Sequence, residues 1–167
     1  LIELFDAAVR AARGEDLLIA NSAVAPGAWR YFGPGGAVEV PLPPPGRGKV
    51  LVTGAGKAAA SLARGLEAVL GDRIDSGVVP VKHGHGESLR RIAVLEGGHP
   101  VPDAAGLAGT RQIIQTVEAA SENDTMFFVL TGGASALLVE PAPGLSFADV
   151  QTANPLLVNG GAQIDEI

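Results

Sequence analysis

The sequence of 167 residues predicts a Rossmann-like α/β fold, with a mostly parallel sheet and helices on both of its faces. Three observations predict it. Short apolar runs alternate with segments of helical period, the apolar runs are continuous as in strands buried on both faces, and glycine-rich turns follow them. Sheets of this kind bind ligands beyond the carboxyl ends of their strands, so we expect the functional residues in those loops.

The first part of the chain predicts one helix and a long connection. Residues 1–13 carry apolar side chains at helical spacing, which predicts an amphipathic helix that ends at Gly14. The stretch 21–47 is rich in proline and glycine and has only a short strand-like segment at 38–40, so we expect it to be mostly an irregular or edge-hairpin connection.

The remainder of the chain predicts alternating strands and helices. A strand at 49–53 leads through a glycine-rich turn into a strong helix that Gly71 ends. Ser146 and Asp149 are placed to start the last helix, which we expect to kink or divide at Asn154 because Pro155 follows. The predicted elements after the first strand are helices at 58–70, 104–119 and 146–158 and strands at 77–81, 92–95 and 126–130.

The composition excludes several classes of protein. With 47% hydrophobic and 18% charged residues, the chain has the composition of one packed domain. A net charge of −6 argues against nucleic acid as a partner. No apolar run is long enough to cross a membrane, no secretory signal opens the chain, and cysteine is absent. We therefore expect a cytoplasmic protein without a membrane partner.

The first glycine-rich turn contains Gly54, Gly56 and Lys57. Glycines allow a tight turn and a close ligand, and the start of the following helix offers free amides to an anion. The turn is not a P-loop, because Leu51 replaces the first P-loop glycine and Ala58 replaces the magnesium-binding hydroxyl. It also matches a relaxed dinucleotide fingerprint, so a nucleotide, a nicotinamide cofactor and a sugar phosphate all stay open.

Lys57 is the most informative residue of this turn. A cation is unfavourable at the start of a helix unless an anion lies nearby. We therefore interpret Lys57 as a charge directed at phosphate or carboxylate instead of a solvated surface lysine, which argues against an ordinary nicotinamide site.

The second loop, residues 82–87, contains Lys82 and the pair His83 and His85. Two histidines with Glu87 nearby resemble a zinc site, but no third ligand follows at a fixed spacing and the loop is rich in glycine. We assign no metal ligand in the chain, and we expect this loop to contact substrate or simply to be exposed.

The third loop, residues 96–103, leads into the predicted helix at 104–119, and Asp103 is placed as the N-cap of that helix. His99 precedes a proline, which favours an extended backbone and fixes the direction of its side chain. His99 is either a ligand or acid–base group or a packed loop histidine, and both interpretations stay open.

The fourth loop, residues 131–136, presents consecutive amides at Gly132 and Gly133 and a hydroxyl at Ser135. It predicts a second anion-binding turn. Two such turns on neighbouring strands indicate a ligand with two anionic groups, or two ligands that exchange one. This arrangement favours phosphoryl transfer.

Together the four loops resemble the N-terminal domain of the glycerate 2-kinase family, the MOFRL-associated kinases with a DUF4147-type domain, often named hydroxypyruvate reductase. Residues 54–59 resemble the family's GAGKAA turn, residues 82–86 its KYGHG-like loop and residues 98–103 its GHPVPD signature. Residues 131–138 resemble SGGGSALL, and residues 161–167 resemble GADIHEIN. The motifs follow the family's order along the whole chain.

The resemblance implies ATP-dependent phosphorylation of D-glycerate, with magnesium, in a cleft between this domain and a second one. It implies that Lys57 is the catalytic lysine. It further implies a set of phosphate- and substrate-binding residues, namely Gly54, Gly56, Lys82, His99, Asp103, Gly132, Gly133 and Ser135. The chain departs from the family at His83, Thr131 and Ala134, where tyrosine, serine and glycine are usual.

We expect residues 1–167 to be the N-terminal domain of a longer enzyme, because the chain begins without methionine and ends without a cap. The resemblance implies a second domain that this sequence does not include, so we expect residues 1–167 to be inactive alone. The implied partners are D-glycerate, ATP and the protein's own C-terminal domain, and a homo-oligomer stays open. Two alternatives remain: a nucleotide- or sugar-phosphate-binding module without chemistry, and an NAD(P)-dependent hydroxypyruvate reductase.

Overall fold

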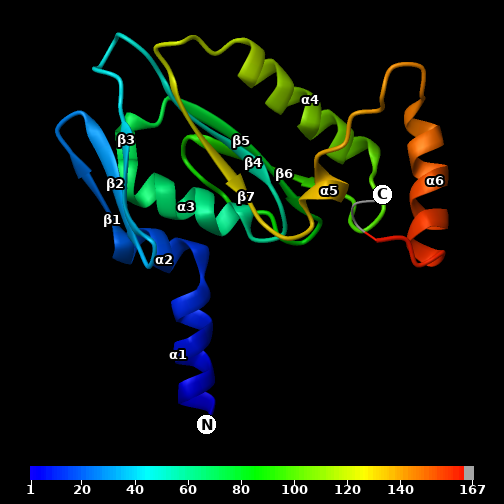
Figure 1. The fold of residues 1–167 in the computed structure, drawn as a ribbon, viewed down its shortest axis with the longest axis horizontal. Helices are drawn as coiled ribbons and strands as arrows, with labels where there is room; N and C mark the ends of the chain where they lie inside the picture. The colour runs from blue at the N-terminus through cyan, green and yellow to red at the C-terminus, as the bar shows by residue number, and fades with distance from the viewer. Residues whose placement is uncertain (164–167) are drawn as a thin grey trace.

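The computed structural model describes residues 1–163, and a four-stranded parallel sheet forms its centre (Figure 1). The strand order is β6-β5-β4-β7, and every neighbouring pair is parallel. The predicted α/β fold with a parallel sheet is confirmed. The strands are β4 (Val50–Ala55), β5 (Ser76–Lys82), β6 (Ile92–Gly97) and β7 (Thr125–Leu130).

Two helices cover the sheet, as predicted. Helix α3 (Ala59–Leu70) and a short 3-10 turn (Gly71–Arg73) connect β4 to β5, and α4 (Ala104–Glu118) connects β6 to β7. The chain runs outward from β4 through β5 to β6 and then crosses to β7 on the other side of β4. Because such crossovers are right-handed, α3 and α4 lie on opposite faces of the sheet (Figure 1).

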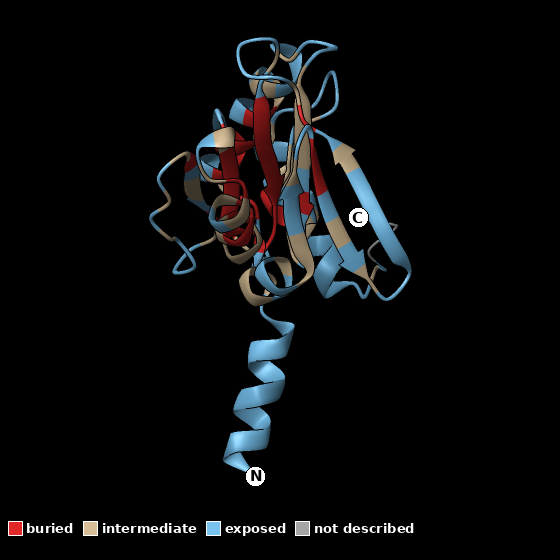
Figure 2. Cartoon of the chain, turned by 90° about the vertical axis from the view of Figure 1, so that its left-hand side faces the viewer, coloured by how far each residue is buried: buried red, intermediate tan, exposed pale blue. Residues whose placement is uncertain are grey.

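The hydrophobic core is centred on β4, in which all six residues are buried (Figure 2). Small side chains of α3, including Ala59 and Ala63, pack with Val52 and Val79 of the sheet in one buried cluster. Continuous burial on both faces explains why the strand reads as an uninterrupted apolar run.

Of the two alternatives for residues 21–47, the irregular connection is wrong, and antiparallel hairpins form instead. They form an antiparallel sheet with strand order β1-β2-β3. Prolines and glycines occupy its two tight turns, whereas Trp29 and Tyr31 alternate with the exposed Arg30 along the central strand. Trp29 packs edge-on against Phe127, with ring centroids 5.2 Å apart. The strands are β1 (Ser22–Ala25), β2 (Ala28–Gly33) and β3 (Gly36–Pro41).

The N-terminal segment forms two helices, α1 (Ile2–Ala12) and α2 (Gly14–Asn21). The predicted first helix is present, but Gly14 begins α2 instead of ending α1. A Cβ atom at Gly14 would lie 2.7 Å from Leu62 Cδ2, so glycine allows α2 to pack closely on α3. Helix α1 projects from the domain without a buried residue (Figure 2).

The C-terminal segment contains α5 (Ala134–Leu137) and α6 (Phe147–Asn159). Ser146 and Asp149 form the predicted cap, in which each side chain accepts from the other's amide. Helix α6 continues through Pro155 and does not divide at Asn154, because the proline removes only one backbone donor. Residues 164–167, the end of the predicted GADIHEIN-like motif, lie outside the described residues. None of the helices within 1–163 has the length and hydrophobicity that a bilayer span requires.

Candidate functional site

The turns that follow β4 and β7 meet at the carboxyl edge of the sheet. The Lys57 amide donates to the Gly132 carbonyl at 3.0 Å, and the Ala58 amide donates to Thr131 Oγ1 at 3.1 Å. Strand order reverses between β4 and β7, and this switch point is where doubly wound sheets bind their ligands. The fold thus joins the two glycine-rich turns that were predicted to bind anions.

Three of the predicted loops converge at Gly133. A Cβ atom at this glycine would lie 2.8 Å from His99 Nε2 and 3.2 Å from Lys57 Cγ. Lys57 is exposed, and within residues 1–163 neither its ammonium group nor the His99 ring has a hydrogen-bond or ion-pair partner. The structure therefore places one uncommitted cation and one uncommitted imidazole beside the second turn.

The first turn does not offer the free amides that were expected from the sequence. The Gly56 amide donates to the Pro80 carbonyl at 3.2 Å, and the amides of Lys57 and Ala58 are bonded to the second turn. The turn lies between β5 and the second turn, so its backbone satisfies its hydrogen bonds within the protein. Gly54 and Gly56 are both buried and provide close packing instead of an open cradle for an anion.

The second turn has the opposite character. Within residues 1–163 the amides of Gly132, Gly133 and Ser135 have no acceptor, and the Ser135 hydroxyl also has no partner. Gly132 and Ser135 are exposed. Several adjacent donors without internal acceptors are suited to bind phosphate or carboxylate.

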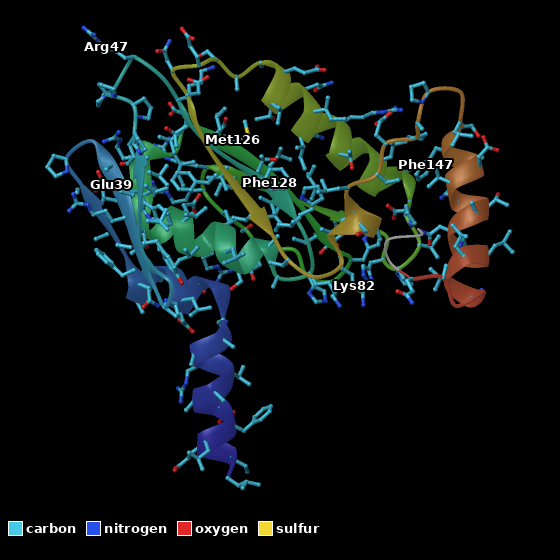
Figure 3. All side chains as sticks on the ribbon, viewed as in Figure 1. Glu39, Arg47, Lys82, Met126, Phe128 and Phe147 are labelled. Atoms are coloured by element: carbon cyan, nitrogen blue, oxygen red, sulfur yellow. The ribbon has the colours of Figure 1, made fainter. Side chains whose placement is uncertain are left out.

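Lys82 lies at the same edge of the sheet, where β5 ends (Figure 3). It is opposite Gly97 of β6 in the parallel register. Its ammonium group has no carboxylate partner within the described part of the chain. Lys82 therefore adds a second uncommitted cation to this edge, one strand away from Lys57.

Asp103 is the N-cap of α4, as predicted, and its Oδ1 accepts from the Gly106 amide at 2.8 Å. Its Oδ2 lies 2.7 Å from His83 Nε2. Partial burial opposes ionisation, but the Gly106 amide and the His83 ring hold the pKa of the Asp103 carboxyl below its ordinary value. Both oxygens have partners inside the protein, so Asp103 organises the site, and its contact with substrate stays a prediction.

The contacts of His83 with two carboxylates were not predicted from the sequence. Its Nδ1 lies 3.7 Å from Glu96 Oε2, while its Nε2 bonds to Asp103, and this bond raises the pKa of His83. Glu96 Oε1 accepts from the Gly84 and Gly86 amides, at 3.2 and 2.8 Å, and these bonds lower the pKa of Glu96. Within residues 1–163 no group of three or more histidines and carboxylates is arranged to hold a metal ion.

A cavity of about 380 Å³ opens beside the convergence point. Helix α6 forms its outer wall and is tied to the third loop by the Gln151 side chain, which donates to the Pro102 carbonyl at 3.1 Å. Asn154 Oδ1 is buried there without a hydrogen-bond partner among the described residues. The lining residues are His99, Pro100, Pro102, Gly133, Ser135, Ala136, Val139, Val150, Asn154 and Val158.

The sequence was compared with models of known protein families. A family model described as a domain of unknown function, DUF4147, matches residues 1–167. The chain belongs to the DUF4147 family. The predicted resemblance is therefore confirmed at the level of the family.

Curated relatives of this DUF4147 chain carry two kinds of name. The chain is 40% identical to a glycerate 2-kinase of Pyrococcus horikoshii, over 72% of this chain and 27% of that protein. It is 38% identical to a D-glycerate 2-kinase of Thermotoga maritima, over 80% and 32%. It is also 39% identical to a protein of Agrobacterium vitis named as a hydroxypyruvate reductase, over 72% and 31%.

Solved structures place the same fold in longer proteins. A Pyrococcus horikoshii protein has a TM-score of 0.82 at 33% identity, and Thermotoga maritima glycerate kinase has a TM-score of 0.73 at 30% identity. Each match covers 98% of this chain and 35% of the solved chain. The DUF4147 chain thus spans about a third of the length of the relatives it matches.

Proposed function

We propose that the protein containing this DUF4147 chain transfers the γ-phosphoryl group of ATP to a hydroxyl of D-glycerate. The observation that carries the proposal is the convergence of Lys57 and His99 on the second turn, whose amides have no internal acceptor. Relatives named glycerate 2-kinase support glycerate as the acceptor. Phosphoryl transfer depends mainly on positioning and charge neutralisation, and this site supplies both.

In the proposed reaction, a glycerate hydroxyl oxygen forms a bond to the γ-phosphorus while the bond from the γ-phosphorus to the β,γ-bridging oxygen breaks. ADP leaves with that bridging oxygen, and the hydroxyl proton passes to water. The Lys57 ammonium neutralises charge on the transferred group. The amides of Gly132, Gly133 and Ser135 hold phosphate or the substrate carboxylate, and His99 contacts the same ligand. Lys82 adds positive charge to the edge.

Magnesium fits this chain only as a companion of the nucleotide phosphates, because residues 1–163 contain no cluster that is arranged to hold a metal ion. The ion would neutralise phosphate charge. The chain's own contribution is the cation and the donors described above.

The remaining part of the protein, its C-terminal domain, is proposed to supply the opposite wall of the cleft. Residues 1–167 alone would then bind ligand weakly and would not turn over. A nicotinamide-dependent reductase is disfavoured by a specific contact: the dinucleotide pyrophosphate normally rests on the amides of the first turn, and here Gly56 and Lys57 donate within the protein.

The test is replacement of Lys57 in the full-length protein. We expect Lys57→Met to lower ADP formation with glycerate by about a thousandfold, because the developing charge loses its counterion, while the unfolding temperature stays unchanged. Lys49→Met is the matched control, since Lys49 lies at the opposite end of β4, and it should keep near-normal turnover.

Other outcomes separate the alternatives. Near-normal turnover in Lys57→Met rejects the assigned role of this lysine. Absence of ADP in the wild type, combined with tight binding of a sugar phosphate, favours a binding module without chemistry. Oxidation of NADH or NADPH in the presence of hydroxypyruvate favours the reductase.

A further inference from the structure

The loop after β5 is bonded to both sides of the candidate site. On one side His85 Nδ1 lies 3.1 Å from the Lys57 carbonyl oxygen. On the other side His83 Nε2 lies 2.7 Å from Asp103 Oδ2. Neither histidine reaches the convergence point at Gly133 through a described contact, so this loop acts from behind the residues that face the ligand.

Asp103 contacts both His83 and the turn that carries His99. Its Oδ1 fixes the start of α4 through the Gly106 amide. A Cβ atom at Gly98 would lie 3.1 Å from Asp103 Cγ, so the turn that carries His99 is closed directly against this carboxyl group. Displacement of Asp103 therefore displaces the turn, and with it the imidazole beside Gly133.

We propose that His83 is a positioning residue that, in its protonated form, bridges Asp103 and Glu96 and thereby fixes His99 relative to Lys57. This inference rests on the proposed phosphoryl transfer and adds a residue to it. The family motif that this loop resembles has tyrosine where this chain has His83.

The bridge is electrostatic, because the imidazolium lies between two carboxylates. Asp103 faces His83 from the start of α4, and Glu96 faces it from β6, while Lys82, His85 and Glu87 are the other titratable groups of its own loop, and Glu87 pairs with Arg64. When His83 loses its proton, one ring nitrogen becomes an acceptor and faces a carboxylate, so one of the two contacts becomes repulsive.

The sign of the pH dependence follows from these contacts. Asp103 raises the pKa of His83, so the bridge is complete below the ordinary histidine pKa and is lost as pH rises through the raised value. Because His83 and Glu96 are exposed and Asp103 is only partly buried, the contribution of these ion pairs to folding is small. We therefore expect the effect in turnover and not in the unfolding temperature.

The experiment compares pH profiles of the full-length wild type, His83→Gln and Glu96→Gln between about pH 6 and about pH 9. In the wild type, kcat for glycerate phosphorylation should fall about three- to tenfold across this range while KM changes less, because a displaced His99 costs orientation. His83→Gln still donates to Asp103 but cannot titrate, so its profile should lose this decline.

Glu96→Gln is the sharper variant. It keeps the oxygen that accepts from the Gly84 and Gly86 amides and removes the charge that faces His83. The decline in kcat should therefore remain but move to lower pH. Ser88→Ala, a change at the exposed residue directly after this loop, is the control and should leave the profile in place.

A decline that persists unchanged in His83→Gln, or one that does not move in Glu96→Gln, overturns the proposal. Absence of phosphoryl transfer at every pH rejects the proposed function instead. In that case the pKa of His83 is measured by NMR titration. The ring signal of His83 is assigned by its absence from the spectrum of His83→Gln. A lower His83 pKa in Glu96→Gln supports the bridge, and an unmoved pKa overturns it.

Discussion

The two glycine-rich turns resemble each other in sequence and follow neighbouring strands, yet the structure uses them in opposite ways. In the first turn the amides of Gly56 and Lys57 donate to the protein, and Gly54 is buried against β7. In the second turn the amides of Gly132 and Gly133 have no acceptor within residues 1–163. One turn is a packing element, and the other presents donors to a ligand.

The difference has a topological cause. The first turn follows a central strand and lies between the ends of β5 and β7, so its polar backbone groups must be satisfied internally. The second turn follows the edge strand β7 and opens onto the cavity beside α6. Glycine content predicts a sharp turn in both places. Glycine content does not predict which groups accept hydrogen bonds from the amides.

The largest expected effect is loss of folding on Gly54→Ala. Gly54 has φ +131°, which alanine rarely adopts, and the added methyl group would overlap the Val129 carbonyl oxygen. We expect destabilisation of about 3 kcal/mol or more, measured as a lower midpoint in thermal or urea unfolding. A midpoint equal to that of the wild type would contradict the packing role of the first turn.

Gly133→Ala should instead impair the site while the domain stays folded. The methyl group would lie 2.8 Å from His99 Nε2 and 3.2 Å from Lys57 Cγ, and both side chains can move aside. Gly133 has φ +89°, which costs alanine about 1 kcal/mol, so the unfolding midpoint should fall only slightly. Displacing the two groups should lower kcat/KM for phosphoryl transfer by about 10- to 100-fold. The unfolding temperature distinguishes a role in the site from a role in folding. A large drop in the unfolding temperature with little loss of kcat/KM would assign Gly133 to folding.

Ser135→Ala removes a hydroxyl group that has no partner among the described residues. The amides of the second turn remain, so we expect only the loss of one hydrogen bond to the bound anion. KM for glycerate or for ATP should rise about fivefold, which corresponds to about 1 kcal/mol, with little change in kcat. The substrate whose KM changes identifies the ligand of this turn. Unchanged values for both substrates would exclude a contact with the hydroxyl.

The sequence predicts local structure and the elements of the site well, because those depend on neighbours along the chain. The buried run at Val50 to Val52 and the cap at Asp103 are both local patterns. The sheet at 22–41 was predicted only in part, as a possible edge hairpin, because its proline and glycine content masked the alternation of Trp29 and Tyr31.

The bridge at His83 was missed for a different reason. His83 meets Glu96 and Asp103 only because β5 and β6 pair in one register, with Lys82 opposite Gly97. Three residues separated by 7 to 20 positions cannot be connected from their spacing alone. In the same way, the availability of amides in the two turns depends on the strand order and not on the turn sequence.

The smallest expected effect is that of Gly132→Ala, and it sharpens the comparison most directly. No described atom lies within 4 Å of a Cβ at this position, and its φ is not in the left-handed region, so the domain should unfold within about 1 °C of the wild type. The substitution keeps the amide, and turnover should therefore be retained. It is also the matched control for Gly54→Ala. A marked loss of turnover with unchanged stability would mean that the ligand approaches the second turn over Gly132 itself, at the face where its Cβ would project.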